Sequence, residues 1–203
     1  MKACRPDELE RAVDWIRQGG IVAFPTDTFY GLAVDPTSSS AVEEVFDLKG
    51  RDARAALPLV AASTGQVEAL CGPLDSRASR LARAFWPGPL SLVLNAPSSL
   101  APAVHAGQST AAIRVPAHDL ARALCAAWGA PLTATSANRS GEPPARGAHD
   151  LRRLSDDARV LIVDGGDTPG GAASTIVDTR GEHVVLVRDG AIAWERVLES
   201  VHE

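Results

Sequence analysis

The sequence predicts a mixed α/β fold around a twisted sheet that contains both parallel and antiparallel strand pairs. Short apolar runs rich in Val and Ile alternate along the chain with apolar residues at helical spacing. Seventeen Gly and fourteen Pro are spread between these segments, which is typical of short elements joined by defined turns. The last two apolar runs are close enough to form a hairpin, which a purely parallel sheet does not contain.

The first part of the chain has a clear order of elements. Apolar residues at helical spacing predict a surface helix over residues 7–18. A short buried strand is expected over residues 21–24, with Pro25 ending it because Pro lacks a backbone donor, and a loop is expected after it. Ser40 is expected to cap a second helix, which places Lys49 at the C-terminal edge of that helix.

The rest of the chain repeats the alternation of strand and helix. The turn over residues 179–181 suits a hairpin between the last two strands. We expect strands over residues 57–62, 90–94, 111–115, 131–135, 160–163, 175–177 and 184–187, and helices through Leu70, through Leu81 and Phe85, and over residues 119–128.

Size and composition favour a single domain over residues 1–203. The chain is 45% apolar, enough for one good-sized core, and shows no internal repeat or linker. No stretch approaches the roughly 18 apolar residues of a membrane span, and no signal-peptide core is present. Three cysteines without C-x-x-C spacing indicate neither disulfides nor a zinc knuckle. We therefore expect a soluble, cytoplasmic protein without membrane contact.

Several common chemistries are missing from the sequence. There is no G-x-x-x-x-G-K-[ST], no G-x-G-x-x-G, no G-x-S-x-G and no H-E-x-x-H. The formal net charge of -5 gives no general attraction to nucleic acid, so RNA binding requires a local basic cleft. Lys49, Arg51 and Arg54 could form such a cleft, or could equally be a solvated surface cluster.

Two polar segments follow predicted strands. The first is PTDTFYGL at residues 25–32, where hydroxyls, a carboxylate and a phenol could bind a small amino acid; the alternative is a turn in which Asp27 satisfies backbone donors. The second runs over residues 133–141, where short hydroxyl and amide groups let a phosphate approach the backbone; by itself it could equally be a helix cap or an ordinary loop. Combined with Lys49 and Arg51, the second segment favours a triphosphate site.

At these residues the sequence resembles the threonylcarbamoyl-AMP synthase family, the YrdC-like proteins. The resemblance covers residues from about 19 to 192, in the order of the family. The matching motifs are PTDTFYGL at 25–32, the K-x-R…S-x-N signature as Lys49-Gly50-Arg51 with Ser136-Ala137-Asn138, W-P-G-P-L at 86–90, R-x-P at 114–116 and S-T-[IV]-[IV]-D at 174–178.

The resemblance implies an enzyme, a nucleotidyltransferase with a concave substrate face on its twisted sheet. Such enzymes condense L-threonine, bicarbonate and ATP, with Mg²⁺ on the nucleotide, into threonylcarbamoyl-AMP and pyrophosphate. The product serves a tRNA modification next to the anticodon, through downstream threonylcarbamoyl-transfer proteins. Weak tRNA binding is also implied. The chain resembles the short form of the family, without the extra C-terminal domain.

The resemblance also implies a role for individual residues, which fall into a phosphate group, a threonine group and a nucleotide group. The implied reaction requires alignment of three substrates and stabilisation of negative charge on the leaving phosphates. This agrees with the lack of an obvious nucleophile in the sequence. Lys49, Arg51, Ser136 and Asn138 are implied as the catalytic residues on the ATP phosphates, Thr26, Arg114 and Ser174 as threonine ligands, and Thr110 and Arg188 as further ATP contacts.

Three positions depart from the family pattern. Asp52 stands where Pro is common, Ala56-Leu57 replaces a basic or amide residue, and Asp189 replaces Pro in Arg-Pro-Gly. These changes bear on ATP affinity, and Arg54 could supply the missing charge. Two alternatives stay open: a noncatalytic RNA-binding protein that uses the same concave face, and a relative that forms carbamoyl-adenylate.

Overall fold

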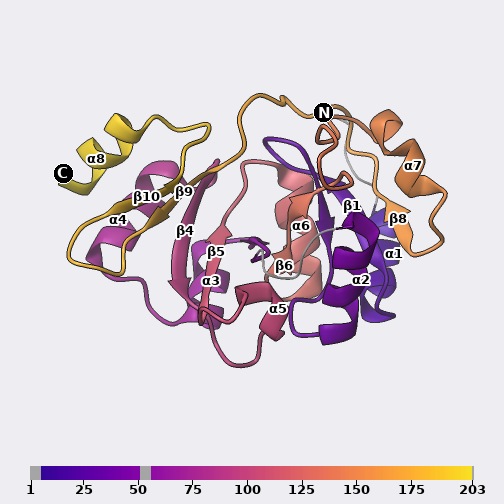
Figure 1. Cartoon of the computed structure of the whole chain (residues 1–203), viewed down its shortest axis with the longest axis horizontal. Helices are drawn as coiled ribbons and strands as arrows, with labels where there is room; N and C mark the ends of the chain where they lie inside the picture. Colours follow the sequence, from indigo (N-terminus) through magenta and orange to yellow (C-terminus); the bar gives the residue numbers. More distant parts are fainter. Residues whose placement is uncertain (1–5, 51–55, 203) are drawn as a thin grey trace.

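The structure of the protein, a computed structural model, describes residues 6–50 and 56–202. The described strands form two sheets of mixed direction with helices packed around them (Figure 1). The predicted mixed α/β class is thereby confirmed. The division into two sheets was not predicted, because apolar periodicity identifies strands but not their partners.

The smaller sheet has four strands and the larger has six. In the smaller sheet β1 pairs antiparallel with β2 and parallel with β8. The smaller sheet has the order β7 (Thr135–Ser136), β2 (Tyr30–Ala33), β1 (Ile21–Pro25) and β8 (Val160–Ile162), and the larger has the order β10 (Val185–Arg188), β9 (Thr175–Asp178), β4 (Leu90–Asn95), β5 (Thr110–Arg114), β3 (Leu59–Val60) and β6 (Leu132–Thr133).

The helices flank both sheets, and they include all five that the sequence predicted, α1, α2, α3, α4 and α6. Helix α1 packs on α6, and α4 packs on α8 at the opposite end of the molecule (Figure 1). The helices are α1 (Pro6–Arg17), α2 (Ser39–Lys49), α3 (Thr64–Cys71), α4 (Ser76–Phe85), α5 (Pro102–His105), α6 (Asp119–Trp128), α7 (Arg152–Ser155) and α8 (Trp194–His202), with the 3₁₀ helix η1 (Ala148–Leu151).

The chain crosses from one sheet to the other at Ala134. The single strand predicted over residues 131–135 is instead two short strands, β6 in the larger sheet and β7 in the smaller. Thr133 joins this crossing to β2, since its hydroxyl donates to the Leu32 carbonyl at 3.1 Å and accepts from the Val34 amide at 2.9 Å. The two sheets are therefore held side by side here, and the residues after the crossing come to lie near β2.

Strand β1 lies at the centre of the apolar core. Its side chains are buried on both faces, with Ile21 and Ala23 in one cluster and Val22 and Phe24 in another. This explains why β1 is a continuous apolar run and not an alternating one. Burial on both faces makes β1 a fixed base for the polar loop that follows it.

Three local predictions require correction. The cap of α2 is Ser38, whose hydroxyl accepts from the Ala41 amide at 3.3 Å, whereas Ser40 lies inside the first turn. The segment after β1, predicted as a loop, returns as β2 after only four residues. Gly31 within β2 gives no strand signal, because Gly is depleted in strands. Helix α8 was not predicted.

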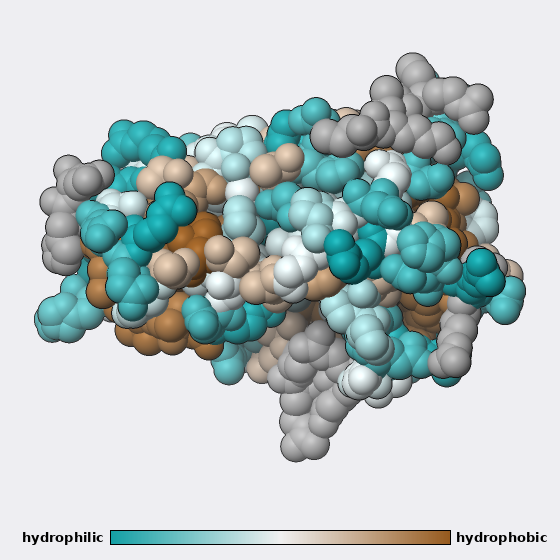
Figure 2. Space-filling model, turned by 90° about the horizontal axis from the view of Figure 1, so that it is seen from above, coloured by the Kyte–Doolittle hydropathy of each residue, from teal (hydrophilic) through white to brown (hydrophobic). Residues whose placement is uncertain are grey.

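The surface is uneven in polarity. In the space-filling view, apolar residues gather at the end of the molecule that carries α8 and β10 (Figure 2). Val185 and Val187 of β10 and Leu198 of α8 are the exposed large apolar side chains in the described part of the chain. Across residues 6–50 and 56–202, no helix combines the length and the apolar character that a membrane crossing needs.

Candidate functional site

A cavity of about 420 Å³ is lined by residues of both sheets. Its wall is formed by the loop after β1, by β3 and β7, by one face each of β5 and β9, and by the end of β10. Residues that the motifs singled out lie on its wall although they are far apart in the sequence. These wall residues are Thr26, Thr110, Arg114, Ser136, Ser174 and Arg188.

Thr26 shapes the loop between β1 and β2. Its amide and its hydroxyl both donate to the Phe29 carbonyl, at 3.1 Å and 2.7 Å, and its hydroxyl accepts from the Thr28 amide at 3.2 Å. A tight turn is therefore present, as one of the two sequence interpretations required. The side chain that makes it is Thr26 and not Asp27, so Asp27 is available for another contact.

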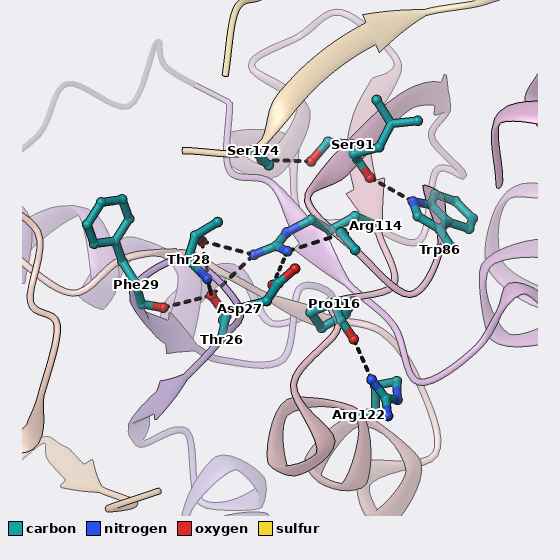
Figure 3. A network of polar contacts seen from close by, with 12 residues as sticks. Thr26, Asp27, Thr28, Phe29, Trp86, Ser91, Arg114, Pro116, Arg122 and Ser174 are labelled. Carbon is teal, nitrogen blue, oxygen red and sulfur yellow. Dashed lines mark hydrogen bonds and ion pairs between the residues drawn. The ribbon is translucent and has the colours of Figure 1, made fainter. Parts of the chain in front are cut away.

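That contact is Arg114, at the end of β5. The two side chains form a buried ion pair, and the guanidinium also donates to the hydroxyls of Thr26 at 3.2 Å and Thr28 at 3.4 Å (Figure 3). A further, longer contact reaches the Gly88 carbonyl at 3.4 Å. We call Thr26, Asp27, Thr28 and Arg114 the Arg114 cluster. It places the Arg114 guanidinium, paired with Asp27, and two hydroxyls at the wall of the cavity.

A second cluster forms where α2 meets the chain after β7. Lys49 is only 4% exposed, and its ammonium donates to the carbonyls of Ser136 at 2.5 Å and Asn138 at 2.8 Å and to the Asn138 side-chain oxygen at 3.2 Å. The Ser136 hydroxyl donates to the same side-chain oxygen at 2.6 Å. We call Lys49, Ser136 and Asn138 the Lys49 cluster. The two segments predicted to converge do so, and they are in direct contact.

Lys49 is not the solvated surface cation that one interpretation of the sequence expected. Among the described residues that line the cavity, Ser136 is present but Lys49 and Asn138 are not. Their polar atoms bond to one another instead, just behind the wall. Gly50, in the left-handed conformation with φ 59°, ends α2 at this point. Arg51, together with Asp52 and Arg54, lies outside the described residues, so its phosphate role stays a prediction.

Ser174 and Arg188 join β4, β9 and β10 at the other end of the wall. The Arg188 guanidinium donates to the Ser174 carbonyl at 2.7 Å and to its hydroxyl at 2.9 Å, and the same hydroxyl lies 3.0 Å from that of Ser91. Ser174 is therefore held by two residues, Arg188 and Ser91. Thr110, at the start of β5, is also buried and lies on the same wall.

Sequence reasoning missed several wall residues. Gln108 lies on the wall, as do Asp178 and Arg180, which form an ion pair at 2.7 Å. The hydrogen bonds from Arg180 hold the pKa of Asp178 below its usual range, so this carboxylate is charged at neutral pH. Asp178 was visible as the last letter of the S-T-[IV]-[IV]-D motif, but it received no role.

Tyr30 is a further buried polar group of this region. Its hydroxyl donates to the Gly166 carbonyl at 2.8 Å, which ties β2 to the segment between β8 and β9. Burial, assisted by the negative charge of Asp164, raises the pKa of Tyr30 to about 12. Tyr30 is therefore a neutral hydrogen-bond donor at physiological pH.

The wall as a whole is suited to holding charged and hydroxylated ligands. It carries three arginines, several hydroxyls and one carboxylate, and its described residues include no His, Cys or Lys. Arginine forks and hydroxyls orient carboxylates and phosphates through directed hydrogen bonds. The arrangement can align reactants and stabilise negative charge, whereas a side-chain nucleophile with its base is not found on the described wall.

Comparison with known proteins agrees with this arrangement. Residues 14–190 match the model of the Sua5/YciO/YrdC family, whose description is "Telomere recombination". The protein is a member of the Sua5/YciO/YrdC family. The resemblance found in its motifs is thereby confirmed.

Three relatives define the likeness. The threonylcarbamoyl-AMP synthase of Bacillus subtilis is 40% identical over 94% of this chain and 55% of its own length, and that of Pyrococcus abyssi is 38% identical over 97% and 58%. The structure of P. abyssi Sua5 in complex with L-threonine superposes with a TM-score of 0.88 at 37% identity, covering 95% of this chain and 56% of that one. The chain thus spans just over half the length of these relatives.

Proposed function

We propose that this protein is a threonylcarbamoyl-AMP synthase, a nucleotidyltransferase that condenses L-threonine, bicarbonate and Mg²⁺-bound ATP and releases pyrophosphate. The names of the relatives and the threonine complex of P. abyssi Sua5 support the proposal. The observation that carries it is the single cavity on whose wall the buried guanidinium of Arg114 and the hydroxyl of Ser136 both lie. An amino acid and a triphosphate can meet there.

In this proposal the Arg114 cluster receives threonine. The guanidinium of Arg114 binds the amino-acid carboxylate through its fork of donors. The hydroxyls of Thr26 and Ser174 face the same cavity and complete the threonine site. All three side chains are buried and hydrogen-bonded before any ligand arrives, so little ordering is needed on binding.

The phosphates of ATP lie toward the Lys49 cluster. Ser136 faces the cavity, and Lys49 places its positive charge directly behind Ser136 and Asn138, where it favours anionic ligands. Arg51 is proposed as the cation that reaches the phosphates, with Thr110 and Arg188 as nucleotide contacts. The loop after β7 is then a phosphate-binding loop supported by a buried charge.

The chemistry follows from this placement. The amine of threonine attacks the carbon of bicarbonate, and loss of water gives a carbamate. A carbamate oxygen then attacks the α-phosphorus of ATP, and the bond from that phosphorus to the pyrophosphate oxygen breaks. No protein nucleophile is required, so most of the acceleration comes from alignment and from stabilising charge on the leaving phosphates.

The chemical class of the product, an acyl-adenylate, indicates which kind of reaction must follow. An acyl-adenylate of this kind must be consumed by a transfer reaction, which we propose is performed by tRNA threonylcarbamoyl-transfer proteins in the cytoplasm. Direct contact with tRNA is at most weak in this proposal. A steep loss of RNA affinity with rising salt would instead favour the RNA-binding alternative.

Pyrophosphate release tests the proposal directly. We expect release only when L-threonine, bicarbonate and ATP are all present, and the adenylate should be found by mass spectrometry. Equal release without threonine would remove the synthase assignment. A reaction depleted of bicarbonate is the matched control, because it leaves ATP and threonine binding intact.

A further inference from the structure

Asp27 occupies a position that neither a simple turn nor a substrate contact explains. Its side chain is 11% exposed, and the Arg114 side chain with which it forms an ion pair is 7% exposed. Among the described residues, Thr26, Thr28 and Arg114 line the cavity, but Asp27 does not. Asp27 therefore makes no direct contact with a ligand in the cavity, and its carboxylate pairs with Arg114 (Figure 3).

The carboxylate of Asp27 is only half satisfied. One oxygen accepts from the Arg114 guanidinium, whereas the other is buried and, within residues 6–50 and 56–202, has no hydrogen-bond partner. Burying a carboxylate with an unpaired oxygen is unfavourable, and buried ion pairs often add no net stability. Fold stability alone is thus a poor reason for an aspartate at this position.

The surroundings leave Arg114 as the main positive charge next to Asp27. His118 feels the charge of Asp27, but burial lowers the pKa of His118, so this imidazole is neutral at pH 7. The guanidinium of Arg114 and the carboxylate of Asp27 then sum to zero charge. Without Asp27, the cavity would end in an uncompensated cation held by hydroxyls and a carbonyl.

We propose that Asp27 is a positioning and charge-balancing residue that makes the Arg114 cluster select a zwitterionic amino acid over a simple carboxylate. A neutral ion pair gives a free anion little long-range attraction, while its two opposite charges still attract a ligand that carries both a carboxylate and an ammonium. The same ion pair fixes the guanidinium in one orientation. The inference rests on the proposed function in that the ligand is an α-amino acid.

The experiment compares L-threonine with 3-hydroxybutyrate, which is threonine without its amine. Binding of each is measured by calorimetry to the wild type and to Asp27→Asn, Asp27→Glu and Asp157→Asn. Asp157→Asn is the matched control, because it removes another Asp–Arg ion pair that is absent from the described cavity wall. For Asp27→Asn we expect the preference for threonine over 3-hydroxybutyrate to fall about tenfold.

Steady-state kinetics give the second measurement. In Asp27→Asn the KM for threonine should rise about tenfold, while kcat should change less than about threefold, because the reacting groups keep their places. Asp27→Glu keeps the charge and should keep the preference for threonine. An unchanged preference in Asp27→Asn, or an equal loss of preference in Asp27→Glu or Asp157→Asn, overturns the inference.

Two further outcomes separate this inference from the proposed function. A wild-type protein that binds threonine without releasing pyrophosphate would contradict the synthase proposal, and the calorimetric preference would still test Asp27. Should Asp27→Asn fail to fold, as judged by its circular dichroism, Asp27→Glu decides alone. A loss of threonine preference in that charge-conserving variant would then overturn the inference.

Discussion

The Arg114 cluster and the Lys49 cluster each contain a buried cation at the C-terminal end of a helix or strand, yet the two cations lie differently relative to the cavity. Arg114 bonds to side chains and lies on the wall. Lys49 donates to the carbonyls of Ser136 and Asn138. It is not among the described residues that line the cavity. Two cations from family motifs can thus differ in role: Arg114 lies where it can contact a ligand, and Lys49 supports a loop.

The chemistry of the two side chains accounts for the difference. The guanidinium of Arg114 has five donors in a planar fork, so it can bond to the side chains of Asp27, Thr26 and Thr28 and keep a donor for a further contact. The ammonium of Lys49 has three donors, and three oxygens of Ser136 and Asn138 lie within hydrogen-bond distance. Lys49 is therefore suited to fix the loop, and Arg114 to receive a carboxylate.

The largest effect is expected for Arg114→Ala. Removal of the guanidinium leaves the buried carboxylate of Asp27 without its partner, which should lower the free energy of unfolding by about 3–5 kcal/mol. Urea denaturation at pH 7 measures this, and kinetics should show a raised threonine requirement with little change for ATP. The comparison between the two clusters fails if Arg114→Ala instead raises the KM for ATP.

A control and a rescue sharpen this prediction. Arg159→Ala removes an arginine whose side chain is 42% exposed and which pairs with Glu44 and Asp157, so it should cost less than about 1 kcal/mol. The double variant Arg114→Ala with Asp27→Asn should regain part of the lost stability, because no buried charge is left over. A double variant less stable than Arg114→Ala would contradict the ion-pair explanation.

The sequence predicted the strongly apolar elements well and their partners poorly. Residues 21–24, 111–115 and 119–128 were placed to within one residue, because each is buried by its own apolar pattern. The short strand β2 and the break at Ala134 depend on pairing between distant segments, which periodicity does not report. The same limit holds for the split of the strands into two sheets.

In the candidate site, too, the sequence predicted individual residues better than their partners. Motif matching selected Thr26 and Arg114, and both lie on the described wall of the cavity. The two residues are 88 positions apart in the sequence and are joined by a hydrogen bond. The pairing of Asp27 with Arg114 was not predicted, since a turn explained Asp27 equally well from local sequence. The inward direction of Lys49 was also missed, because it depends on the carbonyls of a loop that only the folded chain brings near.

A middle-sized effect is expected for Lys49→Met, which keeps the apolar stem and removes the ammonium. The carbonyls of Ser136 and Asn138 then lose a charged donor, which should lower the free energy of unfolding by about 1.5–3 kcal/mol. The KM for ATP should rise because the loop after β7 is no longer held. Urea denaturation and ATP kinetics measure the two effects, and Lys49→Arg is the control that keeps the charge.

The Lys49→Met variant also tests whether the two clusters differ in role. If Lys49→Met keeps the stability of the wild type and loses only ATP use, Lys49 acts on the ligand and not on the loop. The loop-support explanation would then be wrong, and both cations would belong to one class. Loss of both stability and ATP use, with threonine binding unchanged, keeps the two clusters distinct.

The smallest effect is expected for Asp157→Asn, which supplies the baseline of an exposed pair. Hydrogen bonds from Arg159 lower the pKa of Asp157 from 3.8 to about 2. A lowered folded-state pKa means that Asp157 adds stability above pH 3.8 and loses that contribution as the pH falls toward 2. Because the pair is partly exposed, the wild type should exceed the variant by less than about 1 kcal/mol at pH 7. Urea denaturation at pH 7 and pH 3 should show this difference shrinking, whereas a difference that grows at pH 3 would contradict the sign of the shift.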